Sequence, residues 1–227
     1  MDFAPFDKRN YPMLGVREGY GEWVTTYEAT VSDVMDIRLL TRADVAWSGA
    51  EILDLACGTG RIGRWTKAQG ARAVDGVDMT PEMLERARAS GVYRELVLGD
   101  IRSTAQPDAA YDVCTQSLAC EHLPDVAPLY AEAARVTRPG GRFVLVGYHP
   151  HFMMMGIPTH FDRAAGVSVA IDTHLHHLSE HAKAARAAGF SIESLDESVV
   201  DEALLAIKPK WAKFAGQPMT FCFVFAR

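Results

Sequence analysis

The stretch that most constrains the fold of this chain is residues 51–61, Glu-Ile-Leu-Asp-Leu-Ala-Cys-Gly-Thr-Gly-Arg. It begins as an apolar run with one acidic residue, Asp54, turns at Gly58 and Gly60, and continues with a helical pattern. Glycine permits positive φ and lets a ligand approach the backbone, and the start of the following helix presents unpaired N–H groups. The stretch therefore predicts a strand, a tight loop and a helix that form a binding site.

The rest of the chain repeats this alternation of strands and helices. Six further apolar runs read as strands, at about residues 73–77, 94–98, 111–116, 142–147, 190–195 and 219–225. Helical patterns separate most of them, and one further helix is predicted over about residues 25–45. This spacing predicts a parallel sheet with helices on both faces and a ligand at the carboxyl ends of its strands.

Length and charge restrict the class of protein. A chain of 227 residues fits a single domain, residues 1–227, with room for a small cap. Its formal net charge of −6 argues against nucleic acid or an anionic membrane as a partner. The first residues lack the pattern of a signal peptide and no segment is apolar for long enough to span a bilayer, so we expect a cytoplasmic protein.

Two segments depart from the alternation. Residues 1–24 set Tyr11, Tyr20 and Trp23 among glycines, which suits either a flap over a pocket or a packing arm. Residues 148–178 hold six of the eight histidines and a run of three methionines. A long segment inserted after a central strand favours a role on the substrate side.

The insert offers an apolar wall and a candidate metal site. Phe152, Met153 and Met154 could form an adaptable wall of a pocket for a flat or hydrophobic molecule. Core packing and a homodimer contact are the alternatives. His174 and His176 would share the face of a strand. Because no paired carboxylate or thiolate stands at ligand spacing, we expect no metal.

The glycine-rich loop also matches G-x-G-x-x-G, with Asp78 lying 20 residues beyond Gly58. Taken alone, this pattern fits a dinucleotide-binding enzyme such as an NAD(P)-dependent reductase. The chain lacks room for a second domain and has no Tyr-x-x-x-Lys pair. Asp54, before the glycines, places a negative charge where a cationic ligand fits better than a pyrophosphate.

A series of motifs along the chain indicates the ligand more specifically than the glycine pattern alone. They are residues 53–60, 76–84, 99–101, 111–113 with 122–125, 138–142 and 187–190. In this order they resemble the class I S-adenosylmethionine (SAM) dependent methyltransferases of the small-molecule type. The resemblance is dense over residues 50–147 and implies a Rossmann-like, doubly wound sheet of seven strands, mostly parallel with an antiparallel last strand.

The resemblance also implies a set of cofactor contacts. Asp54 and the backbone near Gly58 and Gly60 would hold the methionine end, although Asp54 could instead only orient the loop. Asp78 would accept the ribose hydroxyls, and Asp100 the adenine amino group. The full set that it implies is Asp54, Ala56, Gly58, Gly60, Asp78, Met79, Asp100, Ile101, Gln116 and Ser117.

Methyl transfer is an in-line displacement, in which a base assists if the acceptor is a hydroxyl or a protonated amine. His149 and His151, just past the fifth strand, are expected at the mouth of the crevice, and His122 is a further candidate or a helix-entry residue. The expected reaction moves a methyl group from SAM to a small molecule and releases S-adenosylhomocysteine. A protein-directed methyltransferase and a SAM-binding protein without methylation remain the alternatives.

Overall fold

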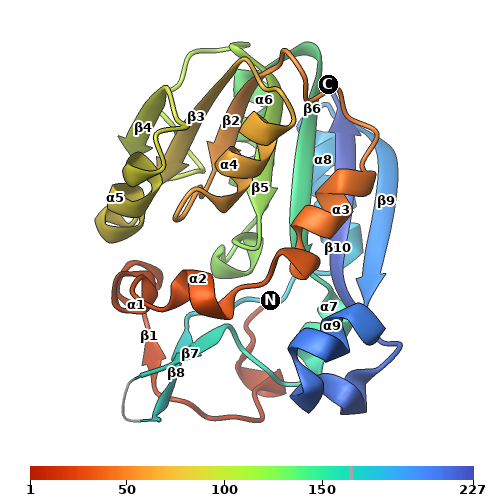
Figure 1. The fold of residues 1–227 in the computed structure, drawn as a ribbon. Helices are drawn as coiled ribbons and strands as arrows, with labels where there is room; N and C mark the ends of the chain where they lie inside the picture. Colours follow the sequence, from red (N-terminus) through yellow and green to blue (C-terminus); the bar gives the residue numbers. More distant parts are fainter. Residues whose placement is uncertain (164–165) are drawn as a thin grey trace.

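The computed structural model describes residues 1–163 and 166–227, and its centre is a seven-stranded sheet (Figure 1). The strand order is β4-β3-β2-β5-β6-β10-β9. These strands are β2 (Glu51–Leu55), β3 (Ala73–Asp78), β4 (Glu95–Leu98), β5 (Tyr111–Ser117), β6 (Thr137–Tyr148), β9 (Ser191–Val199) and β10 (Pro218–Ala226). Strand β10 runs antiparallel to β6 and β9, and the other pairs are parallel, so the predicted Rossmann-like α/β fold is confirmed.

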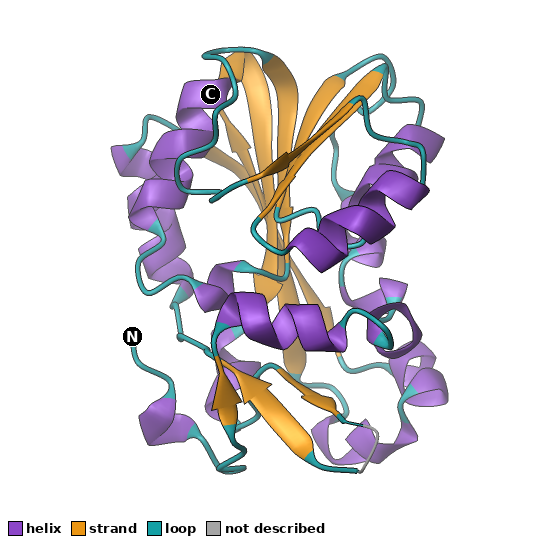
Figure 2. Ribbon diagram, turned by 90° about the vertical axis from the view of Figure 1, so that its left-hand side faces the viewer, coloured by secondary structure: helices purple, strands orange, loops and turns teal. Residues whose placement is uncertain are grey.

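Helices cover both faces of the sheet (Figure 2). The α-helices are α1 (Val16–Trp23), α2 (Tyr27–Thr30), α3 (Ile37–Arg42), α4 (Arg61–Ala68), α5 (Pro81–Ala89), α6 (Ala127–Val136), α7 (Pro150–Met154), α8 (Leu178–Ala187) and α9 (Glu202–Ile207). Short 3-10 helices are η1 (Ala4–Phe6), η2 (Asp33–Met35), η3 (Cys120–His122) and η4 (Pro209–Phe214). Among the described residues, no helix has the length and apolar character needed to cross a bilayer.

Strand β6 shows why the central strands read as continuous apolar runs. Phe143 and Leu145 pack into the core on the side of α6 and α8, whereas Val144 and Val146 pack on the side of α3 and α4. Successive side chains of a strand point to opposite faces, so a strand buried on both sides needs apolar residues at every position.

The single helix predicted over residues 25–45 is wrong, because the segment is broken into α2, η2 and α3. The break falls at Asp36, whose backbone leaves the helical region and whose carboxylate accepts the N–H of Ile37 as a cap. The same carboxylate binds the Arg61 guanidinium and the Ser117 hydroxyl. Helical spacing was correct locally, but a buried polar cluster decides where each helix ends.

The two segments that departed from the alternation form one small sheet. Its strands are β1 (Met13–Leu14), β7 (His160–Asp162) and β8 (Ser168–Ile171), in the order β1-β8-β7. Met13 pairs with Ala170 in parallel orientation, which joins the N-terminal segment to the insert. Residues 164 and 165 of the insert lie outside the described residues.

The strand predicted to carry His174 and His176 is also wrong. His174 makes an isolated bridge with Asp2, and His176 lies outside any strand with its Nε2 2.7 Å from the Leu123 carbonyl oxygen. The two imidazoles therefore do not share a strand face.

Candidate functional site

A cavity of about 880 Å³ lies at the carboxyl ends of β2, β3, β4 and β5. Figure 1 shows α1 and α2 beyond the arrowheads of these strands. Residues of α1, including Tyr20, line the side of the cavity opposite the sheet. This first cavity occupies the edge at which an open α/β sheet binds its ligands.

The loop after β2 presents one glycine to this cavity. Gly58 has φ +53°, and a Cβ added to it would meet no atom within 4 Å. The other two glycines of the G-x-G-x-x-G pattern serve a different purpose. A Cβ on Gly60 or Gly63 would lie 2.9 Å or 2.2 Å from the Tyr93 side chain, so these glycines make room for that ring and not for a ligand.

Asp78, the last residue of β3, is one of the acidic residues that line the first cavity. Its Oδ2 accepts the N–H of Gly58 and its Oδ1 accepts the N–H of Thr80, both at 2.8 Å. Burial raises the pKa of Asp78, and the two N–H groups oppose that shift. Each carboxylate oxygen keeps a further lone pair, so Asp78 is held in place by the backbone and can still accept from a ligand.

The end of β4 supplies a second acidic group and apolar contacts. Asp100 lines the cavity and is half exposed, with both its oxygens bonded to the Arg102 guanidinium. Ile101 and Met79 also line it, and Met79 leaves 43% of its surface exposed. An exposed methionine beside a cavity offers a flat apolar surface to a ring.

The loop after β5 completes this side of the cavity. Ser117 lines it and donates its hydroxyl to Asp36 at 2.9 Å. Leu118 and Ala56, both lining residues, have φ values of +51° and +58°, which are strained for residues other than glycine. Such strained positions cluster at functional sites.

Three of the predicted cofactor contacts do not line the cavity: Asp54, Gly60 and Gln116. Asp54 is buried behind the loop, where its oxygens accept the hydroxyls of Tyr93 and Thr115 at 2.7 Å and 3.0 Å. Burial raises the pKa of Asp54 to about 6, although those two hydrogen bonds act to lower it. This placement favours the alternative that Asp54 orients the loop.

Gln116 is turned away from the cavity by the alternation of β5 and is 1% exposed. With its amide oriented to satisfy its neighbours, the side-chain oxygen accepts N–H groups of the following loop, from Ala119 at 2.8 Å and Cys120 at 3.2 Å. The residue therefore shapes the loop that carries Ser117.

His122 is the candidate base that the structure places at the first cavity. Its Nδ1 lies 2.6 Å from the Asp172 carbonyl oxygen, so this nitrogen carries the proton. Its Nε2 lies 2.9 Å from the Tyr20 hydroxyl and accepts from it in the neutral imidazole. Burial raises the pKa of Tyr20, which keeps this phenol protonated and able to donate.

Glu121, beside His122, is a buried acid that the sequence analysis did not single out. Its side chain is 1% exposed, and neither carboxylate oxygen has a hydrogen-bond partner within residues 1–163 and 166–227. Oε1 lies 3.8 Å from the His122 Nε2, and Thr159 is close by without meeting hydrogen-bond geometry. Burial raises the pKa of Glu121, and the neighbouring His122 opposes this. Buried carboxylates are rarely left unpartnered, so Glu121 needs an explanation.

The predicted position of His149 and His151 at the crevice mouth is wrong, because neither residue lines the first cavity. The His149 Nε2 lies 2.7 Å from Glu197 of β9, and the His151 Nε2 lies 3.3 Å from the Gln217 amide oxygen. Strand β6 extends to Tyr148, which carries both histidines past the ligand edge toward β9 and β10.

A second, larger cavity of about 1440 Å³ lies beyond α1 and α2. Tyr11, Trp23, Phe152 and Met153 line it, whereas Met154 does not. Trp23 separates the two cavities together with Tyr20 and Tyr27, which line the first; its ring centroid is 5.7 Å from that of Tyr20 and 5.0 Å from that of Tyr27. Tyr20 and Trp23 of the N-terminal segment, with Tyr27, thus stand between the two cavities.

Sequence reasoning missed Tyr27, Tyr93, Tyr148 and Glu121. Tyr148 lines the second cavity, and its phenol lies close enough to Glu121 and Tyr27 for both to raise its pKa, after burial as the main cause. The only signal for Tyr93 was the unexplained third glycine of the pattern. Glu121 stands in a motif that reads as a helix entry, which conceals its burial.

Comparison with known proteins identifies relatives. Residues 53–145 match a family described as a methyltransferase domain. A malonyl-[acyl-carrier protein] O-methyltransferase of Serratia marcescens is 36% identical over 56% of this chain and 49% of that protein. The ubiquinone/menaquinone biosynthesis C-methyltransferase UbiE of Bdellovibrio bacteriovorus is 32% identical over 48% of each. The chain therefore spans about half the length of the curated relatives that it matches.

A solved structure matches over more of the chain. The S-adenosylmethionine-dependent methyltransferase of Mesorhizobium loti is 27% identical, covers 92% of this chain and 99% of its own, and superposes with a TM-score of 0.64.

Proposed function

We propose that this chain, whose residues 53–145 match a methyltransferase domain, transfers a methyl group from S-adenosyl-L-methionine to a small molecule. S-adenosyl-L-homocysteine would be the second product. The observation that carries the proposal is the first cavity, where the Asp78 carboxylate is fixed by the glycine-rich loop and faces a ligand-sized space. The net charge of −6 supports a small acceptor over nucleic acid.

The residues of the first cavity fit this cofactor. Asp78 can accept both ribose hydroxyls through its remaining lone pairs, and Met79 with Ile101 can cover the adenine. Gly58 leaves the backbone open to the methionine end, because no side chain could stand there without filling the space. The cofactor supplies a sulfonium-bound methyl group that a nucleophile displaces in line.

In the proposed mechanism the chain contributes position, exclusion of water and a proton acceptor. Helices α1 and α2 cover the cavity with Tyr20 and Tyr27, which keeps water from the reacting atoms. The N-terminal segment would therefore act as a flap, and the insert that pairs with it as the acceptor side.

We assign the base to His122. The Asp172 carbonyl fixes the proton on Nδ1, which leaves the Nε2 lone pair for a proton from the acceptor, either directly or through the Tyr20 hydroxyl. The Glu121 carboxylate, 3.8 Å from Nε2, would then pair with the imidazolium. This role gives the unpartnered acid an explanation.

Calorimetry and thermal shift test the cofactor. SAM and S-adenosylhomocysteine should bind and raise the melting temperature, whereas NADH should do neither. Binding of NADH alone would refute the proposal.

Incubation with methyl-labelled SAM and a fractionated extract tests the reaction. Label in a small-molecule fraction supports the proposal, and mass spectrometry then identifies the acceptor. Label on a protein would instead indicate a protein-directed enzyme. SAM binding without any S-adenosylhomocysteine would indicate a binding protein.

A further inference from the structure

The charge on the lining of the second cavity is opposite in sign to that of the whole chain. The chain has a net charge of −6, yet six basic residues line this cavity: Arg9, Arg61, Arg64, Lys208, Lys210 and Lys213. Acidic residues of the lining are fewer, namely Glu28, Asp33 and Asp162. A basic hollow in an acidic protein indicates selection for a negatively charged occupant.

Two of the six cations already have partners in the protein. Arg61 binds Asp33 and Asp36 at 2.7 Å and 2.9 Å, and Arg64 binds Glu28 at 2.7 Å. Arg9 and the three lysines have no carboxylate within ion-pair distance in the described part of the chain. The excess positive charge of the lining is therefore concentrated on these four residues.

Lys208 is the most constrained of the four. Its Nζ donates to the Thr30 carbonyl oxygen at 3.1 Å and lies 5.0 Å from the centre of the Trp211 ring. Partial burial, together with the nearby Lys210, lowers the pKa of Lys208. An anion that binds beside this partly buried ammonium would supply the counter-charge that it lacks.

Aromatic residues form another part of the cavity wall. Phe152 contacts Trp211 and Phe214, with ring centroids 5.3 Å and 5.8 Å apart, and the Lys213 Nζ lies 4.9 Å from the Phe214 ring. Cationic groups thus stand directly beside a continuous apolar surface. A ligand that satisfies both must join an apolar body to an anionic group.

We propose that the second cavity binds the methyl acceptor, and that this acceptor is an amphiphilic organic anion whose carboxylate or phosphate lies against Lys208 and Lys210. This inference rests on the proposed methyl transfer, because the acceptor's other end must reach the first cavity. Trp23, which lines the second cavity, packs against Tyr20 and Tyr27, which line the first, so aromatic side chains stand between the two cavities.

The test uses the full chain saturated with S-adenosylhomocysteine. Its probes are decanoate, decyl phosphate, decan-1-ol and decyltrimethylammonium, each below its micelle concentration. Binding is followed by calorimetry and by quenching of tryptophan fluorescence, since Trp23 and Trp211 line the cavity. We expect the two anions to bind roughly tenfold more tightly than the alcohol and the cation not to bind. The ratio between decanoate and decyl phosphate distinguishes a carboxylate site from a phosphate site.

Substitutions of Lys208 and Lys210 test whether these two residues bind the anionic group. Lys208→Gln combined with Lys210→Gln should weaken decanoate binding roughly tenfold and leave S-adenosylhomocysteine binding unchanged. Lys208→Arg should retain binding, and Lys183→Gln, on the exposed side of α8, is the matched control. Equal affinity for the alcohol and the anions, or for the double variant and the parent, would overturn the assignment. If S-adenosylhomocysteine itself fails to bind, the proposed function fails; if it binds and the anions do not, only the acceptor class fails.

Discussion

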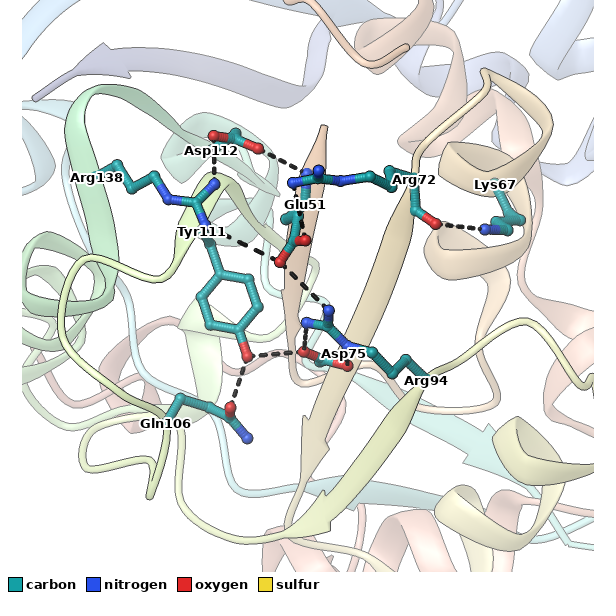
Figure 3. A network of polar contacts seen from close by, with 9 residues as sticks. All are labelled: Glu51, Lys67, Arg72, Asp75, Arg94, Gln106, Tyr111, Asp112 and Arg138. Atoms are coloured by element: carbon teal, nitrogen blue, oxygen red, sulfur yellow. Dashed lines mark hydrogen bonds and ion pairs between the residues drawn. The ribbon is translucent and has the colours of Figure 1, made fainter. Parts of the chain in front are cut away.

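Acidic residues at the two ends of β2, β3 and β5 differ in whether an arginine pairs with them. At the amino ends of β2, β3 and β5, the carboxylates of Glu51, Asp75 and Asp112 face arginines (Figure 3). At the carboxyl ends of the same strands, Asp78 and the nearby Glu121 have no arginine or lysine within ion-pair distance among the described residues.

The network at the amino ends satisfies its own charges. Arg94 bridges Glu51 and Asp75, and Arg138 binds Asp112 at 2.6 Å (Figure 3). Asp75, at 2% exposure, also accepts the Tyr111 hydroxyl at 2.9 Å. Nothing at this end requires a ligand.

Asp78 and Glu121 have neutral donors or none, in contrast to Asp100 at the end of β4, which pairs with Arg102. Backbone N–H groups position Asp78, and Glu121 is left without a hydrogen bond from residues 1–163 or 166–227. Burial raises the pKa of both acids, and within residues 1–163 and 166–227 no arginine or lysine pairs with either of them. The difference separates acids that stabilise the fold from acids that are available to a ligand or a proton.

The largest expected effect concerns the base. His122→Gln should lower the rate of label transfer from SAM by roughly 10²–10⁴-fold while SAM affinity stays the same, because proton removal is lost and the cofactor contacts remain. His151→Gln is the matched control, since His151 lies outside the first cavity. An unchanged rate for His122→Gln would remove this residue from the mechanism.

Asp78→Ala should weaken SAM binding roughly 100-fold or more, through the loss of two hydrogen bonds to a charged acceptor at about 1.5–3 kcal/mol each. Isothermal calorimetry measures the change. Asp75→Ala, an acid on the same strand at the opposite end, should bind SAM like the parent. Similar losses in both variants would mean that the two ends do not differ.

Asp75→Ala should instead lower the free energy of unfolding by about 1–3 kcal/mol, because Arg94 and the buried Tyr111 hydroxyl lose their shared acceptor. Urea denaturation of the two variants compares them directly. If Asp78→Ala proved the more destabilising, the acids at the carboxyl ends would be the structural ones.

The smallest expected effect is a gain in stability, in contrast to the loss expected for Asp75→Ala. Glu121→Met should raise the free energy of unfolding at pH 8 by about 1 kcal/mol, since an unpartnered buried carboxylate is replaced by an apolar side chain of similar length. Burial raises the folded-state pKa of Glu121 above its unfolded value, so between those pKa values the folded state binds more protons and the acid's unfavourable contribution grows as pH rises. The gain should therefore be largest at pH 8 and vanish below the unfolded pKa. A loss of stability at pH 8 would show that Glu121 has a stabilising partner.

The sequence predicted the sheet and the ligand edge well, because both depend on local pattern. Strands buried on two sides appear as apolar runs, and Gly58, Asp78 and Asp100 stand where those runs end. The direction of a side chain is harder to read. Asp54 and Gln116 lie in strands at positions that turn behind the ligand edge, toward Tyr93 and the loop after β5.

Long-range contacts explain the remaining errors. His149 and His151 follow a strand end, as ligand-binding residues often do, but the antiparallel β10 and the Glu197 side chain hold them elsewhere. The role proposed for His122 depends on its contacts with Tyr20 and Asp172, which are remote in the sequence. Spacing within a motif carries no information about such partners.

The pairing of Met13 with Ala170 has a consequence for biosynthesis. The ribosome completes the strands of the first cavity before residue 170 is made, so a nascent chain can form the glycine-rich loop and the Asp78 edge while its first helix is still undocked. Helix α1 packs against α5 and, through Gly19, against Ile171, so its packing is complete only once β8 has emerged. Residues 13–23 therefore cannot complete their packing until residues 168–171 are made, although the strands of the first cavity come earlier in the chain.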